Sequence, residues 1–311
     1  MKRVKIVIVL LSIMIIFTAC SKKGESSDLD AGMTIKEIPT ISEVPIGIDE
    51  PHQEINPGAD IASDTSTSIP DSTTSIPTEI LEPTFEPVKI NGQVGDIIIL
   101  GSYEQDNDLS NGEEPIEWIV LSNDGEKLLL LSKYALDSKP YNINKEDTTW
   151  EKCSLRNWLN NDFYSTAFNS SEKAVIRNSS IENPNNQFYE TAGGNGTEDH
   201  IFLLAYNDVI NPGYGFNNNH EEFDMARRCI PTAYAISQGA LTSEIHKDRE
   251  WFSDRYLSAE GNYTCCWWLR TPGGLARNTI RVDYDGYVFI DGHGVDFDRI
   301  TVRPALYVDV N

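Results

Sequence analysis

The chain has 311 residues, with 48 acidic against 25 basic residues and a formal net charge of −23 at pH 7. Nucleic-acid phosphates and anionic lipid headgroups both require Lys and Arg partners, so this balance argues against nucleic-acid binding and against electrostatic adhesion to a membrane. The four cysteines beyond residue 20 form no CxxC pair and have no Cys/His spacing suited to zinc, so no structural zinc site is expected.

Residues 1–19 have the pattern of an export signal. Basic residues at positions 2, 3 and 5 precede a short apolar run, which ends in Phe-Thr-Ala before Cys20. The run is shorter than the roughly 20 residues of a membrane-spanning helix. A cysteine after small residues resembles the lipobox of bacterial lipoproteins, with Phe17 where leucine is usual.

This pattern predicts cleavage before Cys20 and lipidation of Cys20, which would anchor the protein to the outer face of the cell membrane. Because cleavage removes three basic residues and no acidic ones, the net charge falls from −23 to −26. The alternatives are an uncleaved N-terminal anchor and a cleaved signal without lipid. Both also place the remaining chain outside the cytoplasm.

Residues 20–87 have the composition of a disordered linker. They contain no Trp or Tyr, and the sequence Thr-Ser-Ile-Pro occurs at Thr67–Pro70 and again at Thr74–Pro77. With 14 acidic and 3 basic residues between positions 21 and 87, the segment buries too little apolar surface to offset its ordering entropy. It is interpreted as an extended stalk, or as a spacer with no particular length requirement.

From Val88 the pattern changes to that of a globular domain, residues 88–311. Apolar runs predict strands within Val94–Tyr103, Ile116–Leu121 and Lys127–Ser132, the last two joined by a turn at Asn123-Asp124-Gly125. Helical spacing of apolar residues predicts a helix over 155–168 with Ser154 as its N-cap, and a capping signature at Ser170/Ser171 predicts a second, short helix.

The second half of the domain is predicted to be rich in β-structure. We expect a strand over Ile201–Tyr206, a loop over Asn211–Asn219, a short helix that ends at Gly239, and alternating β-pattern over the last seventy residues. The fold class is therefore α+β: a single domain, antiparallel and β-rich, with a few short helices.

The segment Thr264–Gly274, TCCWWLRTPGG, has two interpretations. Cys265 or Cys266 could be a nucleophile or copper ligand, but no base can be assigned to either thiol from the sequence. Core packing is favoured, with alternate residues of a strand on opposite faces, Arg270 paired with a carboxylate and Pro-Gly-Gly turning the chain. Arg303 in Val302–Val308 is likewise expected to form a buried carboxylate pair.

Three stretches together carry a family resemblance: Leu155–Phe168, Trp267–Gly273 and Val302–Val308. They resemble a family of uncharacterised extracytoplasmic domains, a "domain of unknown function" class of Gram-positive surface proteins, over essentially all of residues 92–310. The resemblance supplies no activity. The order of elements is also similar to the C-type-lectin-like fold, which includes formylglycine-generating enzymes, but the adjacent Cys265 and Cys266 do not match the separated cysteines of those enzymes.

Two sets of residues in loops and turns are candidates for ligand contacts. Aromatic residues beside Gly, Asn or acidic residues suit glycan or protein recognition, and these are Tyr214, Phe216, Tyr284 and Tyr287. Clustered carboxylates suit calcium, and these are Asp283, Asp285, Asp291, Asp296 and Asp298. In both sets an ordinary role in the core or on a half-exposed strand is the alternative.

The sequence therefore predicts a membrane-anchored surface lipoprotein whose domain binds an extracellular ligand (glycan, cell wall or protein) without catalysis. No cofactor is predicted, and calcium, for which the five aspartates are candidate ligands, is the alternative. The alternatives are a cell-wall hydrolase, a cysteine- or copper-dependent oxidase related to formylglycine-generating enzymes, and a purely structural spacer.

Overall fold

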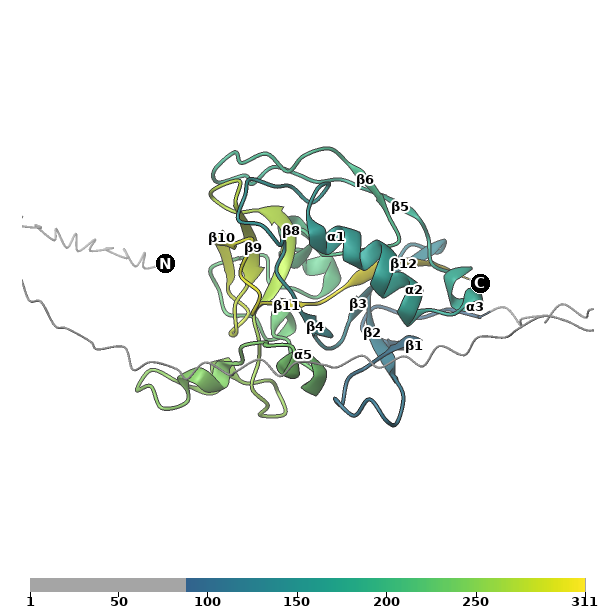
Figure 1. Ribbon diagram of the computed structural model, residues 1–311, viewed down its shortest axis with the longest axis horizontal. Helices are drawn as coiled ribbons and strands as arrows, with labels where there is room; N and C mark the ends of the chain where they lie inside the picture. The colour runs from purple at the N-terminus through teal and green to yellow at the C-terminus, as the bar shows by residue number, and fades with distance from the viewer. Residues whose placement is uncertain (1–87, 311) are drawn as a thin grey trace, which may run out of the picture. The chain divides into compact units, whose positions relative to one another are not determined.

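Two five-stranded sheets organise residues 88–310, the part of the chain that the computed structural model describes. The signal peptide (1–19), Cys20, the rest of the linker (to residue 87) and Asn311 lie outside these residues. Figure 1 shows strands β8–β10 toward one side of the domain and β1–β3 toward the other. Within residues 88–310, no helix has the length and apolar character needed to cross a bilayer.

The strands pair antiparallel except β8 and β11, which are parallel. The first sheet has the order β1 (Ile97–Tyr103), β2 (Glu114–Asn123), β3 (Lys127–Ser132), β12 (Ala305–Asp309), β7 (Ile201–Phe202). The second has the order β10 (Val288–Gly294), β9 (Asn278–Val282), β8 (Trp267–Pro272), β11 (Thr301–Val302), β4 (Asp137–Ser138). A separate pair consists of β5 (Ser179–Ile181) and β6 (Thr197–Asp199).

The helices are short. The α-helices are α1 (Ser154–Trp158), α2 (Tyr164–Ala167), α3 (Ser170–Lys173), α4 (Tyr206–Val209) and α5 (Ala233–Ser237). A π-helical turn, η1 (Leu159–Phe163), joins α1 to α2, and the 3₁₀ turns are η2 (Pro212–Tyr214), η3 (Met225–Arg227), η4 (Ser243–His246) and η5 (Asp254–Tyr256). The prediction of a single α+β domain, antiparallel and β-rich with a few short helices, is confirmed.

The hairpin between β2 and β3 forms as predicted, because its turn residues satisfy the backbone locally. Gly125 has a φ of +90°. The Asp124 carboxylate accepts the N–H groups of Glu126 (3.0 Å) and Lys127 (2.9 Å). The helix that ends before Gly239 is also confirmed, since Gly239 has a φ of +107° directly after α5.

Three local predictions are wrong by one or a few residues. The N-cap of α1 is Cys153, whose Sγ accepts the Arg156 N–H (3.4 Å), and not Ser154. The N-cap of α3 is Asn169, which forms a capping box with Glu172, and not Ser170 or Ser171. The strand predicted for Ile201–Tyr206 ends at Phe202, because the Asp208 carboxylate binds the Ala205 N–H (2.7 Å) and starts α4.

Four of the six tryptophans form the centre of the core. Trp118, Trp150, Trp267 and Trp268 are each fully buried. Their indole N–H groups donate to Leu100 O (2.7 Å), Asp199 Oδ2 (2.8 Å), Arg227 O (3.0 Å) and Lys139 O (2.9 Å), respectively. A buried indole needs such a partner, so these bonds fix the rings against segments that are distant in sequence.

The Thr264–Gly274 segment is core strand and turn. All six residues of β8 are buried, and Cys265 and Cys266 just before it are also buried. Arg270 pairs with Asp208 (3.0 Å). The carboxylate partner expected for Arg303 is not found within residues 88–310: its Nε donates to Ser132 O (2.9 Å) and its guanidinium lies over the Trp267 ring (5.0 Å).

A glycine at position 101 allows β1 to pack closely on helix α2. Its φ is +74°, and an added Cβ would lie 2.6 Å from the Ala167 carbonyl oxygen and from a Phe168 ring carbon. The pairing register of β1 with β2 shifts between Ile99 and Ser102, which places this glycine in an irregular part of the strand.

We expect Gly101→Ala to destabilise the domain by at least about 2 kcal/mol, because the substitution adds steric overlap to the roughly 1–2 kcal/mol cost of a positive φ. Gly95→Ala is the matched control, since Gly95 has a φ of +93° and an added Cβ would meet nothing within 4 Å. Urea unfolding of both variants measures the difference. An equal loss of unfolding free energy in the two variants would show that the close packing of Gly101 on α2 does not matter for stability.

Candidate functional site

The four aromatic residues predicted to contact a ligand do not form a common exposed surface. Phe216 is buried in the core, where it contributes packing instead of an exposed contact. Tyr214 and Tyr284 are half-buried and pack against that core. Tyr287 is half-buried in the β9–β10 connection, where its N–H donates to Asp285 Oδ1 (3.1 Å).

Four of the five aspartates proposed for calcium contact different partners, and the fifth is exposed. Asp283 accepts from Arg281 (3.0 Å) and from the Cys266 thiol (2.9 Å), and Asp285 lies 3.9 Å from Arg255. Asp291 binds the Tyr189 hydroxyl, Asp296 lies 3.9 Å from Lys145, and Asp298 is exposed. Neighbours in sequence are thus drawn to separate distant groups and do not converge.

The arrangement best suited to bind a ligand is a groove that the sequence did not indicate, which we call the Trp158 groove. It consists of two adjoining cavities of about 250 Å³ and 320 Å³ that share Trp158 and Asp162 in their walls. The first cavity is lined by Tyr103, Glu104, Glu113, Trp158, Asp162, Phe163, Thr166 and Tyr234. The second is lined by Lys139, Pro140, Ile143, Ser154, Leu155, Asn157, Trp158 and Asp162.

Aromatic side chains from four elements form the wall of the first cavity. Tyr103 of β1 makes edge contacts with Phe163 of η1 (5.2 Å between ring centroids) and with Tyr234 of α5 (5.7 Å). Trp158 of α1 lies 5.5 Å from Phe163. A pocket with aromatic walls and a few polar groups at its rim is the usual form of a ligand site.

A buried carboxylate supports this wall from behind. Asp137, 1% exposed, accepts the Tyr103 hydroxyl (2.7 Å) and lies 3.4 Å from the Lys139 ammonium. That ammonium also lies 4.6 Å from the centre of the Trp158 ring. Burial, together with the charge of Asp137, raises the pKa of Tyr103, so its phenol stays a neutral hydrogen-bond donor.

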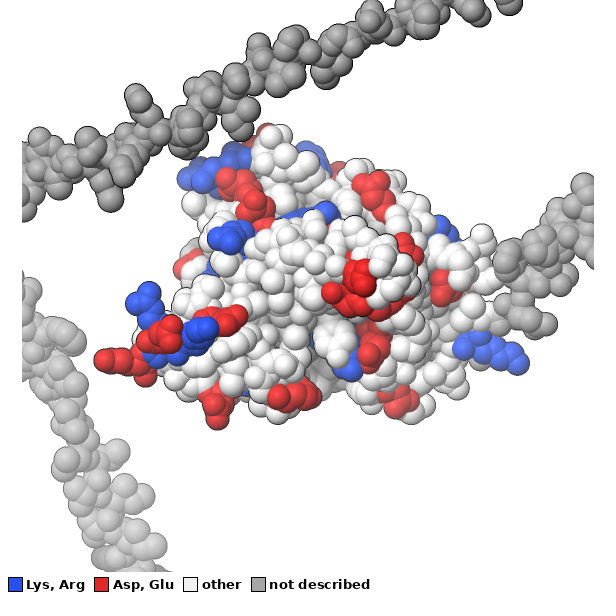
Figure 2. Space-filling model, turned by 60° about the horizontal axis from the view of Figure 1, so that its bottom comes forward, with Lys and Arg blue, Asp and Glu red and all other residues white. Residues whose placement is uncertain are grey.

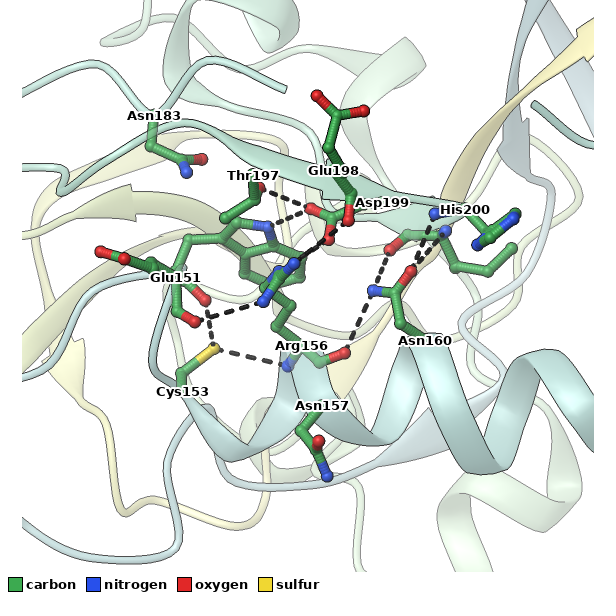
Figure 3. Close-up of polar contacts among 12 residues, drawn as sticks. Glu151, Cys153, Arg156, Asn157, Asn160, Asn183, Thr197, Glu198, Asp199 and His200 are labelled. Carbon is green, nitrogen blue, oxygen red and sulfur yellow. Dashed lines mark hydrogen bonds and ion pairs between the residues drawn. The ribbon is translucent and has the colours of Figure 1, made fainter. Parts of the chain in front are cut away.

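Trp158 is held in the groove by hydrogen bonds made on the other side of its helix. The buried Asp199 carboxylate accepts from the Trp150 indole (2.8 Å), the Thr197 hydroxyl (2.7 Å) and Arg156 Nε (2.6 Å). Figure 3 shows the contacts with Thr197 and Arg156. Arg156 lies two residues before Trp158, so the ion pair with Asp199 fixes the helix that carries Trp158.

Asn160 extends this attachment by one turn. Its side-chain amide donates to Ile201 O (2.8 Å), and its Oδ1 accepts the His200 N–H (2.8 Å) and the Ile201 N–H (3.2 Å). Asn157, a residue of the groove wall, points away from this network in Figure 3. One face of the helical segment is therefore tied to β6 and β7, and another face lines the groove.

Three acidic side chains gather around the end of β1, and one of them, Glu104, lines the first cavity. Glu104, Asp106 and Glu114 each place an oxygen within 4.8 Å of the others. Within residues 88–310 this is the group of side chains with the spacing to hold a metal ion, and it contains none of the five predicted aspartates. Figure 2 shows acidic side chains gathered beside a hollow on the face where the β1–β2 connection projects in Figure 1.

Glu104 differs from its neighbours because it is only 6% exposed. Burial raises the pKa of its carboxyl, and the nearby charges of Glu114 and Asp106 act in the same direction. In contrast, hydrogen bonding from Asn111 lowers the pKa of Asp106, which therefore stays ionised.

The cysteines offer no accessible nucleophile among residues 88–310. All four in this range are buried thiols. Burial raises the pKa of Cys153 to about 12 and raises those of Cys265 and Cys266 well above their usual range. Cys229 differs, because burial acts to raise its pKa but the hydrogen bond with Cys265 and the charge of Arg303 lower it. A reactive thiol needs both exposure and a lowered pKa, and Cys229 is buried.

Fold and groove thus define a β-rich α+β domain with an aromatic, acid-rimmed groove on one face. Residues 125–310 match the model of a family described as a domain of unknown function (DUF6273), and the chain belongs to this family. No curated protein and no solved structure matches the chain. The match begins after β1 and β2, so Tyr103, Glu104, Asp106 and Glu114 precede the matched segment.

We expect Asp199→Asn to destabilise the domain by about 3 kcal/mol, because Arg156 would keep its charge but lose its buried carboxylate partner. Glu198→Gln is the matched control: its side chain is exposed and we expect a change within about 0.5 kcal/mol. Urea unfolding followed by tryptophan fluorescence measures both. Similar stability of the two variants would show that the Asp199 network does not fix α1.

Proposed function

We propose that this protein is a surface lipoprotein, anchored to the outer face of the cell membrane through lipidated Cys20, whose domain binds an extracellular glycan without catalysis. The observation that carries this proposal is the Trp158 groove. Its aromatic wall offers flat apolar faces for the C–H faces of sugar rings, and its rim offers carboxylate and amide groups for sugar hydroxyls.

The charge of the groove narrows the class of glycan. Glu104, Glu113 and Asp162 line it, whereas Lys139 is the basic residue of its walls and lies beside buried Asp137. An acidic groove repels phosphates, sulfates and uronic acids. The preferred ligand is therefore a neutral or amino-bearing glycan, such as a segment of cell-wall polysaccharide.

The anchor and the linker complete the proposal. The N-terminal pattern that ends at Cys20 supports export and lipidation, and the acidic, proline-spaced composition of residues 20–87 supports an extended stalk. The same proposal includes membership of a Gram-positive extracytoplasmic group and a C-type-lectin-like fold. The buried Trp267-Trp268 pair of β8, followed by the terminal strands β11 and β12, supports that fold.

The alternatives differ in what supports them. Hydrolysis of a glycan draws support from the exposed carboxylates Glu113 and Asp162, which line the first cavity together with buried Glu104. Cysteine-dependent oxidation draws no support from the buried thiols Cys265 and Cys266. Non-catalytic glycan binding needs only the groove and no reactive side chain. We therefore choose it over hydrolysis and oxidation.

We expect Trp158→Ala to weaken glycan binding at least about tenfold, because it removes the aromatic surface shared by both cavities. The measurement is binding of the full-length chain, in detergent, to neutral, amino-bearing and anionic glycans and to purified cell walls. Trp251→Ala is the matched control, since Trp251 is 50% exposed and is not part of either groove wall.

The proposal would be overturned if the protein bound only anionic glycans. It would also be overturned if Trp158→Ala and Trp251→Ala lost the same amount of glycan affinity. Release of reducing ends from a bound glycan would replace it with hydrolysis. In that case Glu113→Gln or Asp162→Asn should abolish the release while binding is retained.

A further inference from the structure

We propose that the β1–β2 connection holds one calcium ion, bound by the carboxylates of Glu104, Asp106 and Glu114. The starting observation is proximity: each residue places an oxygen within 4.8 Å of the other two, a separation that one shared ion can bridge. This site is distinct from the aspartates of residues 283–298, and its test requires no glycan in the Trp158 groove.

A buried carboxylate oxygen without a partner points to an ion. Glu104 is 6% exposed, and its Oε1 is buried without any hydrogen-bond partner among residues 88–310. Burying an unpaired carboxylate oxygen is costly, and proteins normally satisfy such an atom with a donor or a cation. The first cavity of the groove borders Glu104, so a hydrated ion can reach it.

The three carboxylates also lack basic partners in the described part of the chain. None of the ion pairs formed within residues 88–310 involves Glu104, Asp106 or Glu114. Three negative charges at this separation repel one another. A divalent cation bound between them would replace this repulsion by attraction of each carboxylate to the ion. The nearest donors are backbone N–H groups and an amide, which orient the carboxylates without neutralising them.

Such donors act on all three carboxylates, and the Asn107 backbone N–H donates to the Glu104 carboxyl, whose Oε1 alone stays without a partner. Glu114 Oε2 accepts the N–H groups of Gln105 (2.7 Å) and Asp106 (3.3 Å). Asp106 accepts the Asp108 N–H (2.7 Å) and the Asn111 side-chain amide (2.8 Å). Each carboxylate oxygen has more than one acceptor position, so these bonds fix the orientation and still permit coordination.

The donor set selects calcium. All three ligands are carboxylate oxygens, which bind hard cations and not the softer zinc or copper ions. Magnesium requires near-ideal octahedral geometry and keeps most of its water, whereas calcium accepts six to eight oxygens in flexible arrangements. Glu104 follows the end of β1, Asp106 lies in the exposed connection and Glu114 begins β2. With water as the remaining ligands, such a flexible set of carboxylates suits calcium better than magnesium.

The test is calcium titration of the full-length chain in detergent after treatment with EDTA. We expect one calcium site with a Kd between about 10⁻⁶ and 10⁻³ M. At a free calcium concentration of about 100 times this Kd, the Tm should rise by at least about 3 °C. Glu104→Gln and Glu114→Gln should each weaken binding at least tenfold. Their circular dichroism and their Tm in EDTA show whether they fold, so loss of the site is distinguishable from unfolding.

Asp108→Asn and Asp296→Asn are the matched controls. Asp108→Asn makes the same charge change in the same connection, at an exposed residue outside the acidic group and outside the groove walls, and Asp296→Asn makes it among the aspartates of residues 283–298. Because the acidic chain also attracts calcium nonspecifically, the decisive result is the difference between variants. Both controls should bind calcium like the unmodified protein.

Three outcomes would overturn the proposal. One is absence of calcium binding, and another is an equal loss of calcium affinity in Glu104→Gln and Asp108→Asn. A third is loss in Asp296→Asn alone, which would place calcium in the β9–β10 region. Tighter binding of magnesium than of calcium would overturn the choice of ion.

Discussion

One buried carboxylate anchors the helical segment that carries Trp158. Asp199 accepts hydrogen bonds from Trp150, Thr197 and Arg156, and thereby joins the core, the β5–β6 pair and helix α1. A charge-assisted bond to a buried carboxylate is stronger and more directional than an apolar contact. These bonds anchor the first turn of the helical segment that α1, η1 and α2 form together, and so set the position from which Trp158 faces Phe163 and the first cavity.

The six tryptophans fall into two groups, those buried in the core with a hydrogen-bond acceptor for the indole N–H and those that remain partly exposed. The four in the core each donate to a carbonyl or carboxylate, and so contribute buried area without an unsatisfied N–H. Trp158 and Trp251 remain outside that core, and Trp158 has Lys139 over its ring and belongs to the walls of two cavities. An aromatic ring that is fixed but incompletely covered is the feature that distinguishes a binding surface from core packing.

Features determined by local backbone chemistry could be predicted from the sequence, whereas the site could not. The hairpin at Asn123–Gly125 and the end of α5 at Gly239 depend on adjacent residues, so both predictions hold. Tyr103 and Tyr234 come from opposite halves of the domain and meet only in the folded chain, and no spacing rule indicates that contact. Conversely, the aspartates of residues 283–298 are close in sequence but are bound by distant groups such as Tyr189 and Lys145, which sequence order cannot reveal.

Glu104 belongs both to the groove wall and to the acidic group, and this shared position couples the two proposals. A cation that coordinates Glu104 would reduce the negative charge of the groove and hold the carboxylate in place beside the aromatic wall. By thermodynamic linkage, a glycan that prefers this arrangement would bind calcium-loaded protein more tightly, and would raise calcium affinity by the same factor. Because the carboxylates precede the segment that matches the family, the matched segment supplies Trp158 and Tyr234, and the β1–β2 connection supplies the charge beside them. The aromatic wall and the acidic rim are therefore separable by mutation, even though a bound ligand would contact both.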